Sequence, residues 1–421
     1  MFKFIHAADI HLDSPLRGLS RYDAAPVDAI RGASRRAFEN LIQHAIEEKV
    51  AFILLAGDIY DGDWKDYSTG IFLSQQIGKL KAHHIHVFAV LGNHDAANKM
   101  TKALDSPSNM TILAHRKVEK MHLADLGVMI HGRSFSAQHI HDNLVTDFAP
   151  ATKDLFNIGL LHTSLDGREG HAPYAPCSID DLRSKGYHYW ALGHVHKYEL
   201  VAQAPWIVFP GCIQGRHIHE TGAKGCVLVT VSEGEVSSVE PVALDVLRWV
   251  LCRVDVTDTA ALREVWERIR PAIASELAAA DGRIIAMRIR LEGASQVAAA
   301  LAADPEHVAQ QCKAIGAELA GEDLWIERVE NAVTSKRDLD AALADDNPLA
   351  NLLNAIIATS HHPDDIDGLP DILAGLRQKI PHEALGSDAT LNLDAPETLQ
   401  RIVQEAKQML VGRLLSVRGD P

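Results

Sequence analysis

The sequence predicts an α/β layered sandwich, followed by a small α+β domain and a helical C-terminal region. Over the first 245 residues, short apolar runs alternate with amphipathic stretches. Such alternation of strands and helices is typical of a layered α/β fold. A β-α-β-α-β pattern follows, and beyond Arg337 the pattern is almost wholly helical. A length of 421 residues agrees with two or three domains.

Eight runs in the first part are rich in apolar residues, and several are continuous, as expected for strands covered on both faces. They are Phe2–Ala8, Ala51–Ala56, Ile85–Leu91, Val128–His131, Ile158–Leu161, Tyr187–Leu192, Trp206–Phe209 and Cys226–Val231. Between the first two lies a predicted helix of about 20 residues, which has Phe38, Leu41 and Ala45 at helical spacing. A second helix is predicted over Tyr67–Lys81.

The second part of the chain predicts three strands and two helices in alternation. They are Arg248–Val256, Ala260–Ala279, Arg283–Leu291, Glu306–Leu319 and Leu324–Val329. We therefore predict domains at residues 1–245, 246–335 and 336–421. The last contains an amphipathic stretch near Thr398–Leu415, which packs in the protein's own core or docks a partner. The sequence leaves both alternatives open.

Composition indicates an ordinary globular protein, with 47% apolar and 23% charged residues. The N-terminal stretch lacks the basic region of a signal peptide, and no apolar run reaches the ~18 residues of a membrane span. The five cysteines have no CxxC spacing and suit a reduced compartment. We therefore expect a cytoplasmic protein that has no membrane partner.

Charge and histidine content give different indications about the partner. The formal net charge of −15 argues against nucleic acid. However, 19 of the 23 histidines precede residue 246, and histidine is the commonest metal ligand. Bound divalent cations would change the local field. The charge therefore weakens a nucleic-acid interpretation without excluding it, and the histidines indicate where the chemistry lies.

Five short polar motifs follow predicted strands. They are Asp9-Ile10-His11, Gly57-Asp58-Ile59-Tyr60-Asp61, Gly92-Asn93-His94-Asp95, His162 and Gly193-His194-Val195-His196. Ligands of open α/β sheets bind at the carboxyl ends of the strands. The five segments can therefore converge on one crevice, and the glycines before Asp58, Asn93 and His194 permit close approach of the backbone.

The residue types in these motifs suit two divalent cations. Asp-x-His and His-x-His each place two ligands on one side of an extended segment. Asp58 can bridge two ions, and Asn93 and His162 add an amide oxygen and an imidazole. Such a mixed set suits Mn²⁺, Fe²⁺ or Zn²⁺. Two ions would clamp a phosphate and activate water, while His94 protonates the leaving oxygen with Asp95 orienting its ring.

In this order the motifs resemble those of the calcineurin-like metallophosphoesterase superfamily, over about residues 1–245. The resemblance implies a four-layer α/β/β/α sandwich and makes His94 the general acid. It also implies two metal sites. These are Asp9, His11, Asp58 and His196 for one ion, and Asp58, Asn93, His162 and His194 for the second. Asp61 is a further catalytic candidate; the archaeal and eukaryotic nucleases of this group usually have histidine there.

Two longer stretches are similar to bacterial DNA repair exonucleases of the SbcD/YhaO type. They are FIHAADIHLDSPLRGL at the N-terminus and FPGCIQGRHIHETGAKG from residue 209. This resemblance implies Mn²⁺ as the cofactor, DNA as the substrate and a coiled-coil SMC-like ATPase of the SbcC/Rad50 type as the partner, and we also consider a homodimer. Arg216, His217 and Lys224 are then candidates for DNA contact.

We therefore predict a metal-dependent DNA exonuclease that acts in DNA repair. The alternative is a small-molecule or cyclic-nucleotide phosphodiesterase of the same superfamily, which the net charge favours. A protein phosphatase is disfavoured, because such enzymes show GD-x-x-D-R-G and GNHE where this chain has Gly62 and Asp95. A scaffold that has lost its metals is disfavoured as well, because no ligand position is substituted.

Overall fold

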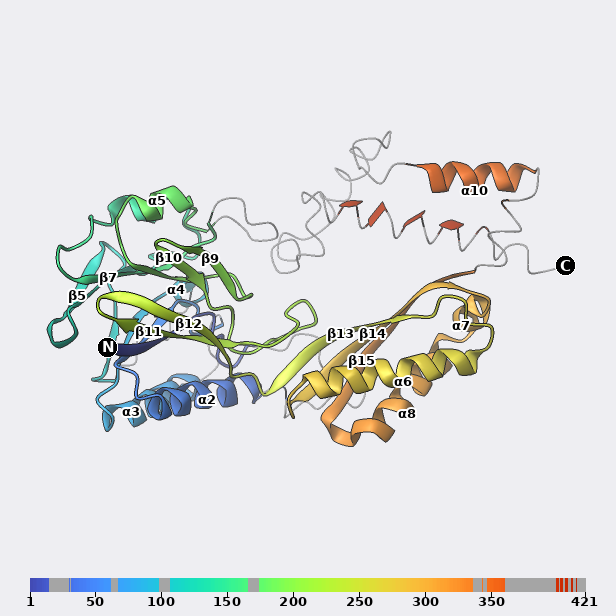
Figure 1. Ribbon diagram of the computed structural model, residues 1–421, viewed down its shortest axis with the longest axis horizontal. Helices are drawn as coiled ribbons and strands as arrows, with labels where there is room; N and C mark the ends of the chain where they lie inside the picture. Colours follow the sequence, from blue (N-terminus) through green and yellow to red (C-terminus); the bar gives the residue numbers. More distant parts are fainter. Residues whose placement is uncertain are drawn as a thin grey trace. The chain divides into compact units, whose positions relative to one another are not determined.

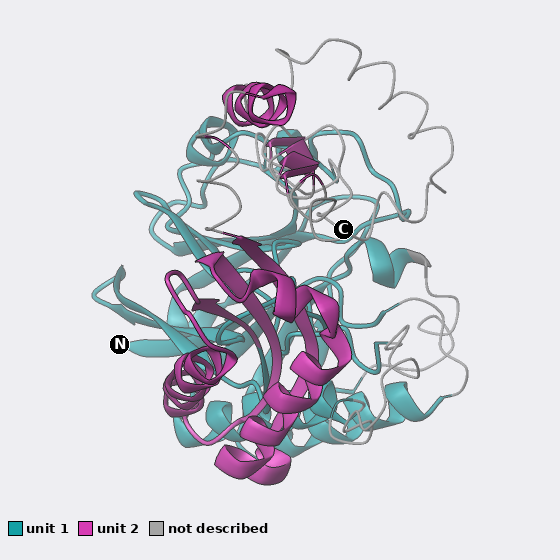
Figure 2. Ribbon diagram, turned by 90° about the vertical axis from the view of Figure 1, so that its right-hand side faces the viewer, with its two compact units in different colours: residues 1–249 teal, residues 250–421 magenta. Residues whose placement is uncertain are grey.

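The computed structural model describes residues 1–14, 30, 32–61, 67–97, 107–165, 174–335, 343 and 347–359, and nine positions between 399 and 414. The chain divides into two compact units, residues 1–249 and residues 250–421 (Figures 1 and 2). No helix in the described part of the chain is long and apolar enough to cross a lipid bilayer.

The first sheet of unit 1 has six strands, and parallel pairing dominates its centre. The strands are β1 (Phe2–Ala7), β2 (Phe52–Ala56), β3 (His86–Val90), β4 (Met110–Ile112), β11 (Gly225–Ser232) and β12 (Glu235–Ala243). Their order is β12-β11-β1-β2-β3-β4. Because β1 to β4 pair in parallel, the carboxyl ends of β1, β2 and β3 lie at one edge of the sheet.

The second sheet of unit 1 also has six strands. They are β5 (Glu119–Leu123), β6 (Val128–Arg133), β7 (Phe156–His162), β8 (Tyr189–Gly193), β9 (Glu199–Gln203) and β10 (Trp206–Phe209). Their order is β5-β6-β7-β8-β10-β9, and the four central strands pair in parallel. The carboxyl ends of β7 and β8 therefore lie side by side.

The two sheets pack face to face, with aromatic rings between them. Phe4 and Phe52 of the first sheet stack with ring centroids 5.0 Å apart, and they pack in one core with Ile158 and Tyr189 of the second sheet. Full burial of such a side chain stabilises the fold by roughly 1.5–3 kcal/mol. This layer of apolar contacts fixes one sheet against the other.

Helices cover the outer faces of both sheets (Figure 1). The helices α2 (Ala33–Glu47) and α3 (Ser68–Lys81) bury their apolar faces on the first sheet. The short helix α5 (Ile179–Arg183) and the 3-10 helix Leu144–Asp147 pack on the second sheet. The expected four-layer α/β/β/α order is therefore confirmed.

Every strand expected in the first part is present, with ends within two residues of the predicted ones. The structure adds β4, β5, β9 and β12. Three of the added strands have little apolar signal: β4 has three residues, and β5 and β12 carry mostly exposed or half-buried side chains. Such strands give no strong sequence signal.

Unit 2 contains a three-stranded sheet in the order β13-β14-β15, covered by helices. The elements are β13 (Leu247–Asp255), α6 (Leu262–Ala279), β14 (Ile284–Ser295), α7 (Ala298–Ala303), α8 (Pro305–Ala320) and β15 (Leu324–Ser335). Ile269 of α6 and Cys312 of α8 pack against Met287 of β14 in the core. The expected β-α-β-α-β order is confirmed, with α7 as an addition.

Beyond β15, the structure describes one further continuous helix, α10 (Pro348–Ala358). This helix agrees with the helical character expected for the C-terminal region. Of the amphipathic stretch expected near Thr398–Leu415, the structure describes nine positions, and the other positions lie outside the described residues.

Candidate metal centre

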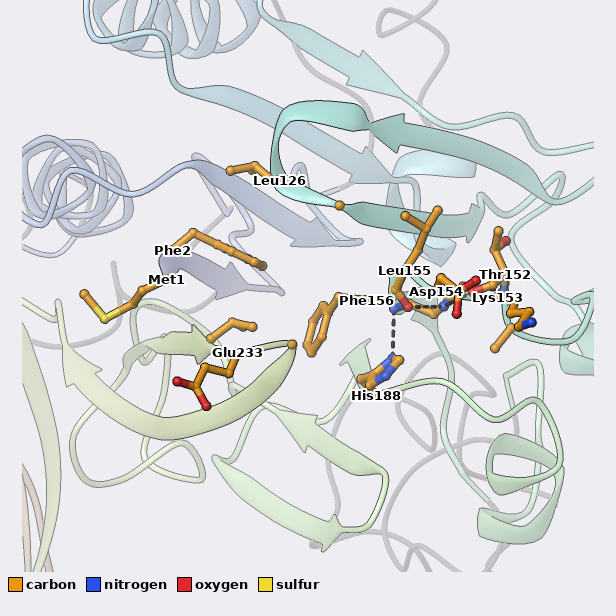
Figure 3. A pocket seen from close by; sticks show the side chains of 15 residues that line it. Met1, Phe2, Leu126, Thr152, Lys153, Asp154, Leu155, Phe156, His188 and Glu233 are labelled. Carbon is orange, nitrogen blue, oxygen red and sulfur yellow. Dashed lines mark hydrogen bonds between the residues drawn. The ribbon is translucent and has the colours of Figure 1, made fainter.

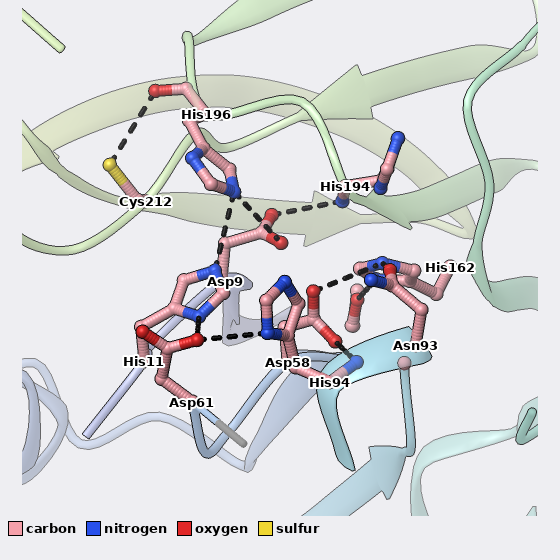
Figure 4. Close-up of polar contacts among 12 residues, drawn as sticks. Asp9, His11, Asp58, Asp61, Asn93, His94, His162, His194, His196 and Cys212 are labelled. Atoms are coloured by element: carbon pink, nitrogen blue, oxygen red, sulfur yellow. Dashed lines mark hydrogen bonds and ion pairs between the residues drawn. The ribbon is translucent and has the colours of Figure 1, made fainter. Parts of the chain in front are cut away.

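The five polar motifs meet at the carboxyl ends of the strands of the two sheets (Figure 4). The residues brought together are Asp9 and His11 after β1, Asp58 and Asp61 after β2, Asn93 and His94 after β3, His162 at the end of β7, and His194 and His196 after β8. Backbone contacts tie the segments to one another: the N–H of His194 donates to Asp9 Oδ2 at 2.9 Å. We call the seven predicted ligands, Asp9, His11, Asp58, Asn93, His162, His194 and His196, the ligand cluster.

Four residues of the ligand cluster have a left-handed backbone. Their φ angles are 51° at Asp9, 46° at His11, 50° at Asp58 and 107° at His194. For residues other than glycine, such values cost of the order of 1–3 kcal/mol each and are concentrated at functional sites. Main-chain bonds hold the segments in place, because the N–H of His11 donates to the Asp58 carbonyl at 3.0 Å. The strained backbone supports the cluster as a functional site.

Two glycines allow side chains of the cluster to approach closely. A Cβ at Gly57 would overlap the ring of His162, and a Cβ at Gly92 would overlap the carboxylate of Asp58. Gly57 also has a φ of 93°, which glycine adopts without steric cost. The close approach that the sequence predicted at these positions is confirmed.

Asp9, His11 and His196 form a first group of converging ligand atoms. Nε2 of His11 lies 3.3 Å from Nε2 of His196, which lies 3.6 Å from Oδ1 of Asp9. On the other side of its ring, His196 Nδ1 lies 2.7 Å from Glu220 Oε1. A carboxylate can only accept, so Nδ1 of His196 carries a proton and Nε2 is directed at the other two ligands.

Asp58, Asn93 and His162 form a second group. His162 Nδ1 donates to the Ala56 carbonyl at 2.9 Å, while Nε2 lies 3.0 Å from Asn93 Oδ1 and 3.5 Å from Asp58 Oδ2. The ligand atoms of Asp9, Asp58 and His162 also lie within 4.8 Å of one another. Asp58 thus belongs to the second group and also lies close to Asp9 of the first group. A carboxylate that bridges two ions would have to lie in such a position.

Both groups fit a divalent cation. Two atoms bound to one ion at about 2.1 Å lie roughly 3.0–3.4 Å apart, and the contacts here range from 3.0 to 3.6 Å. Because Nδ1 of His162 donates to a carbonyl, Nε2 of the neutral ring is an acceptor, and it faces the oxygen of Asn93, which is also an acceptor. Oδ1 of Asp9 has no hydrogen-bond partner among the described residues. Buried acceptors that face one another are costly unless a cation lies between them. The nitrogen and oxygen donors suit Mn²⁺, Fe²⁺ or Zn²⁺.

His194 occupies a less direct position than the other predicted ligands. Its ring centroid lies 5.2 Å from that of His162. Within the described residues, the converging groups of His, Cys, Asp and Glu atoms do not include His194. Its role as a ligand stays a prediction.

His94 lies beside the cluster and is more accessible than the ligands. Its side chain is 38% exposed, compared with 2% for Asp58 and 0% for His162. Oδ1 of Asp61 lies 2.8 Å from His94 Nδ1, so Asp61 orients the imidazole and directs Nε2 away from itself. The structure therefore brings Asp61 and His94 together as a pair.

The expectation that Asp95 orients His94 is wrong. Asp95 is buried, and its carboxylate accepts from the backbone N–H groups of Ile59, Tyr60 and Gly92 at 3.2, 2.9 and 3.0 Å. His94 and Asp95 lie in the short helix α4 (Asn93–Ala97), where consecutive residues do not face each other. Asp95 thus fixes the segments after β2 and β3, and Asp61 takes the role expected for Asp95.

The loop after β10 contributes a residue that the sequence analysis did not single out. Glu220 is buried, and Oε1 contacts both His196 Nδ1 and the Arg216 guanidinium, which lies 2.9 Å away. Residue 220 lies 24 positions from His196, and no spacing rule predicts this contact. A carboxylate on the outer nitrogen of a metal-binding histidine is nevertheless common.

The three candidates for DNA contact have different surroundings. Arg216 lies against Glu220, and Lys224 Nζ donates to the His196 carbonyl at 3.0 Å, so both side chains are directed into the protein. His217 is the more accessible residue, with Nε2 3.6 Å from Glu220 Oε1.

Burial and neighbouring charges shift the pKa values of residues in and around the cluster in different directions. Burial, followed by the charge of Arg216, lowers the pKa of His11 to about 4, which suits a neutral ligand. Burial opposes protonation of His196, but its contacts with Asp9 and Glu220 raise the pKa to about 9. Burial, with the charge of Asp58, raises the pKa of Asp95 to about 7.

A separate cavity of about 630 Å³ lies at the opposite ends of the strands (Figure 3). Its lining includes Phe2 in β1, Phe156 in β7, His188 before β8 and Glu233 after β11. No residue of the ligand cluster lines it. This cavity therefore does not mark the candidate metal centre.

Two segments of the chain match known protein families. Residues 2–198 match the family Calcineurin-like phosphoesterase, and residues 249–334 match the family Metallophosphoesterase YhaO, middle domain. The chain is similar to the metallophosphoesterase YhaO of Bacillus subtilis (strain 168), at 36% identity over 294 residues, which cover 69% of this chain and 71% of YhaO.

A more distant relative is the DNA double-strand break repair protein Mre11 of Sulfurisphaera tokodaii, at 24% identity over 284 residues, which cover 64% of this chain and 68% of that protein. A solved structure, a dimetal phosphatase from Danio rerio, is similar at 13% identity and a TM-score of 0.33, over 55% of this chain and 93% of that chain. On its similarity to YhaO, the chain belongs to the calcineurin-like phosphoesterases and, among them, to the metallophosphoesterases of the YhaO type.

Proposed function

We propose that the chain is a metal-dependent DNA exonuclease that acts in DNA repair and hydrolyses phosphodiester bonds with two divalent cations, of which Mn²⁺ is the one we expect. The observation that carries the proposal is the convergence of two ligand groups on Asp58, with His94 beside them. The similarity to an archaeal protein named for DNA double-strand break repair supports DNA as the substrate.

The residues of the chain have separate tasks in this reaction. When bound, the two cations would hold the phosphate, lower the pKa of a bound water and stabilise the displaced oxygen. Asp61 Oδ1 holds His94 Nδ1 at 2.8 Å, so that Nε2 of His94 can deliver a proton to the leaving oxygen. Asp95 holds the segments that carry Asp58 and Asn93 through its three backbone contacts.

The His94→Ala variant tests the role of the general acid. We expect Mn²⁺ binding, measured by calorimetry, to stay at the wild-type level, while cleavage of a linear DNA duplex falls about 10²–10⁴-fold. His122, which is exposed on β5, provides the matched control, because His122→Ala should keep both properties. Wild-type cleavage by His94→Ala would refute the role of His94. Loss of Mn²⁺ binding would instead indicate that His94 is a ligand, which its proximity to His11 and Asp58 allows.

The net charge of −15 favours a second candidate, a phosphodiesterase for small molecules or cyclic nucleotides. An acidic protein repels the phosphate backbone of DNA unless bound cations compensate. Turnover of a DNA duplex and of a nucleotide diester at one Mn²⁺ concentration separates the two candidates. Turnover of the diester without cleavage of the duplex would favour the second one.

We also propose that the chain works in the cytoplasm with a coiled-coil SMC-like ATPase of the SbcC/Rad50 type, and that it forms a homodimer. The stretches similar to the SbcD/YhaO type support the ATPase partner. Co-purification of the two proteins after co-expression would test the partner, and the mass of the purified chain in solution would test the dimer.

A further inference from the structure

A buried ion pair lies next to the ligand cluster, on the loop that follows β10. The Arg216 guanidinium contacts both carboxylate oxygens of Glu220, with Nη2 2.9 Å from Oε1 and Nε 3.4 Å from Oε2. The backbone N–H of Arg216 also donates to Oε2 at 2.7 Å. Only 17% of the Arg216 side chain and 6% of the Glu220 side chain are exposed. The pair is therefore well shielded from water.

Each member of this pair also contacts a residue of the proposed reaction machinery. Oε1 of Glu220 lies 2.7 Å from Nδ1 of His196. Nη1 of Arg216 lies 3.5 Å from Oδ2 of Asp61, whose other oxygen lies 2.8 Å from His94. A continuous series of charged contacts thus joins His196, after a strand of the second sheet, to His94, after a strand of the first.

The surroundings of the pair argue against a further cation at this position. Ligand atoms of His196, Cys212 and Glu220 lie close enough to one another to hold an ion. However, the Arg216 guanidinium already compensates the charge of Glu220 and lies 3.2 Å from His196 Nδ1. A divalent cation at this position would be repelled by the buried guanidinium.

The same contacts argue against Arg216 as a contact to the DNA backbone. An arginine that binds phosphate must direct N–H donors at the phosphate oxygens. Here the donors are directed at Glu220 and Asp61, inside the protein.

We propose that Glu220 and Arg216 are positioning residues, in which Glu220 fixes the tautomer and orientation of His196, and Arg216 fixes the orientation of His94 through Asp61. The proposal rests on the proposed hydrolytic function of the ligand cluster and extends it by two residues. Loss of a carboxylate behind a metal-binding histidine typically lowers metal affinity or activity about 10–100-fold. The N–H donors of the planar guanidinium point in fixed directions, so Arg216 can contact Glu220 and Asp61 at the same time. A lysine ammonium cannot reproduce this arrangement.

The first test is calorimetric titration of the full chain with Mn²⁺ in the absence of substrate. We expect Glu220→Gln to bind Mn²⁺ about 10–100-fold more weakly, because the neutral amide holds His196 and Arg216 less firmly. The matched control is Glu327→Gln in unit 2, where Nε and Nη2 of Arg288 each lie 2.8 Å from the Glu327 carboxylate. This control removes a largely buried ion pair of similar geometry in the other unit, and it should leave Mn²⁺ affinity unchanged.

The second test separates positioning from substrate binding and uses Arg216→Lys, which keeps the charge but loses the fork. Positioning predicts that kcat falls about 10-fold or more, while KM and its salt dependence stay the same. A direct contact to phosphate predicts a higher KM at an unchanged kcat in Arg216→Lys, and a weaker salt dependence of KM only in Arg216→Ala, which removes the charge. If the guanidinium group acts by holding Asp61 in place, guanidinium ion added to the solution should restore part of the rate of Arg216→Ala.

The outcomes decide the two roles separately. Mn²⁺ affinity of Glu220→Gln within about twofold of the wild type would overturn the role of Glu220. An effect of Arg216→Lys on KM alone would overturn the role of Arg216. If Glu220→Gln does not fold, the kcat and Mn²⁺ affinity of Arg216→Lys decide the proposal. Since Mn²⁺ binding is measured without substrate, failure of the wild type to cleave DNA would refute the nuclease function alone, and kcat would then be measured on bis(p-nitrophenyl) phosphate.

Discussion

Replacement of Gly92 by alanine should displace Asp58, a carboxylate that lies near the ligand atoms of both groups. The added Cβ would lie 2.8 Å from the backbone N and 2.9 Å from Cγ of Asp58, and closer still to Oδ1. Ordinary contact begins at 3.4 Å. Asp58 or the segment that carries Gly92 must therefore move by at least about 0.6 Å, whereas a metal site tolerates deviations of only about 0.2 Å.

This displacement should weaken both metal sites at once, since Asp58 lies near the ligand atoms of both. We expect the affinity for Mn²⁺ to fall at least about 10-fold at each site, as judged by calorimetry. Crowding of this kind also destabilises a fold by about 1–3 kcal/mol, so thermal unfolding in the presence of a chelator should begin at a lower temperature.

Gly78→Ala is the matched control for this variant. Gly78 lies inside α3, and a Cβ there would meet nothing within 4 Å. Alanine should stabilise the helix by roughly 0.5–1 kcal/mol and leave Mn²⁺ affinity unchanged. If Gly92→Ala bound two Mn²⁺ ions with wild-type affinity, the inference that Asp58 is shared by both sites would be refuted.

Two further predictions concern stability. Mn²⁺ at about 100 times its dissociation constant should stabilise the folded chain by about 2.7 kcal/mol for each occupied site and raise the unfolding temperature of unit 1 by roughly 5–10 °C per site. Scanning calorimetry of wild type and His11→Ala measures this shift, and an equal shift in both would contradict the role of His11. Leu41→Ala should lower the free energy of unfolding by about 2–5 kcal/mol in urea, because Leu41 is completely buried between α2 and the first sheet. The control Leu352→Ala, at a side chain that is 48% exposed, should have little effect.

The central strands could be predicted from the sequence because they are apolar on both faces. β2 reads FILLA, and each of its residues is buried, so neither the type nor the place of this element was ambiguous. β12 could not be predicted in this way, because its side chains are exposed or half-buried along its whole length. Its place at the edge of the first sheet depends on pairing with β11, which is a tertiary effect.

The ligand cluster could be anticipated because each motif directly follows an apolar strand. The partners of these residues could not be anticipated in the same way. Asp95 is the neighbour of His94 in sequence, but the helical turn separates the two side chains, and Asp61 approaches from another loop. Glu220 reaches His196 across a loop whose path no local pattern encodes. Contacts between side chains on different loops depend on loop geometry, which apolar spacing does not report.

The division of the ligand set between two sheets ties activity to the completion of folding. His11 and His196, whose Nε2 atoms lie 3.3 Å apart, are separated by 185 positions along the chain. A nascent polypeptide that has left the ribosome only as far as β7 contains Asp9 and Asp58 but lacks His194 and His196, which follow β8. The ligand cluster is therefore complete only when both sheets are in place.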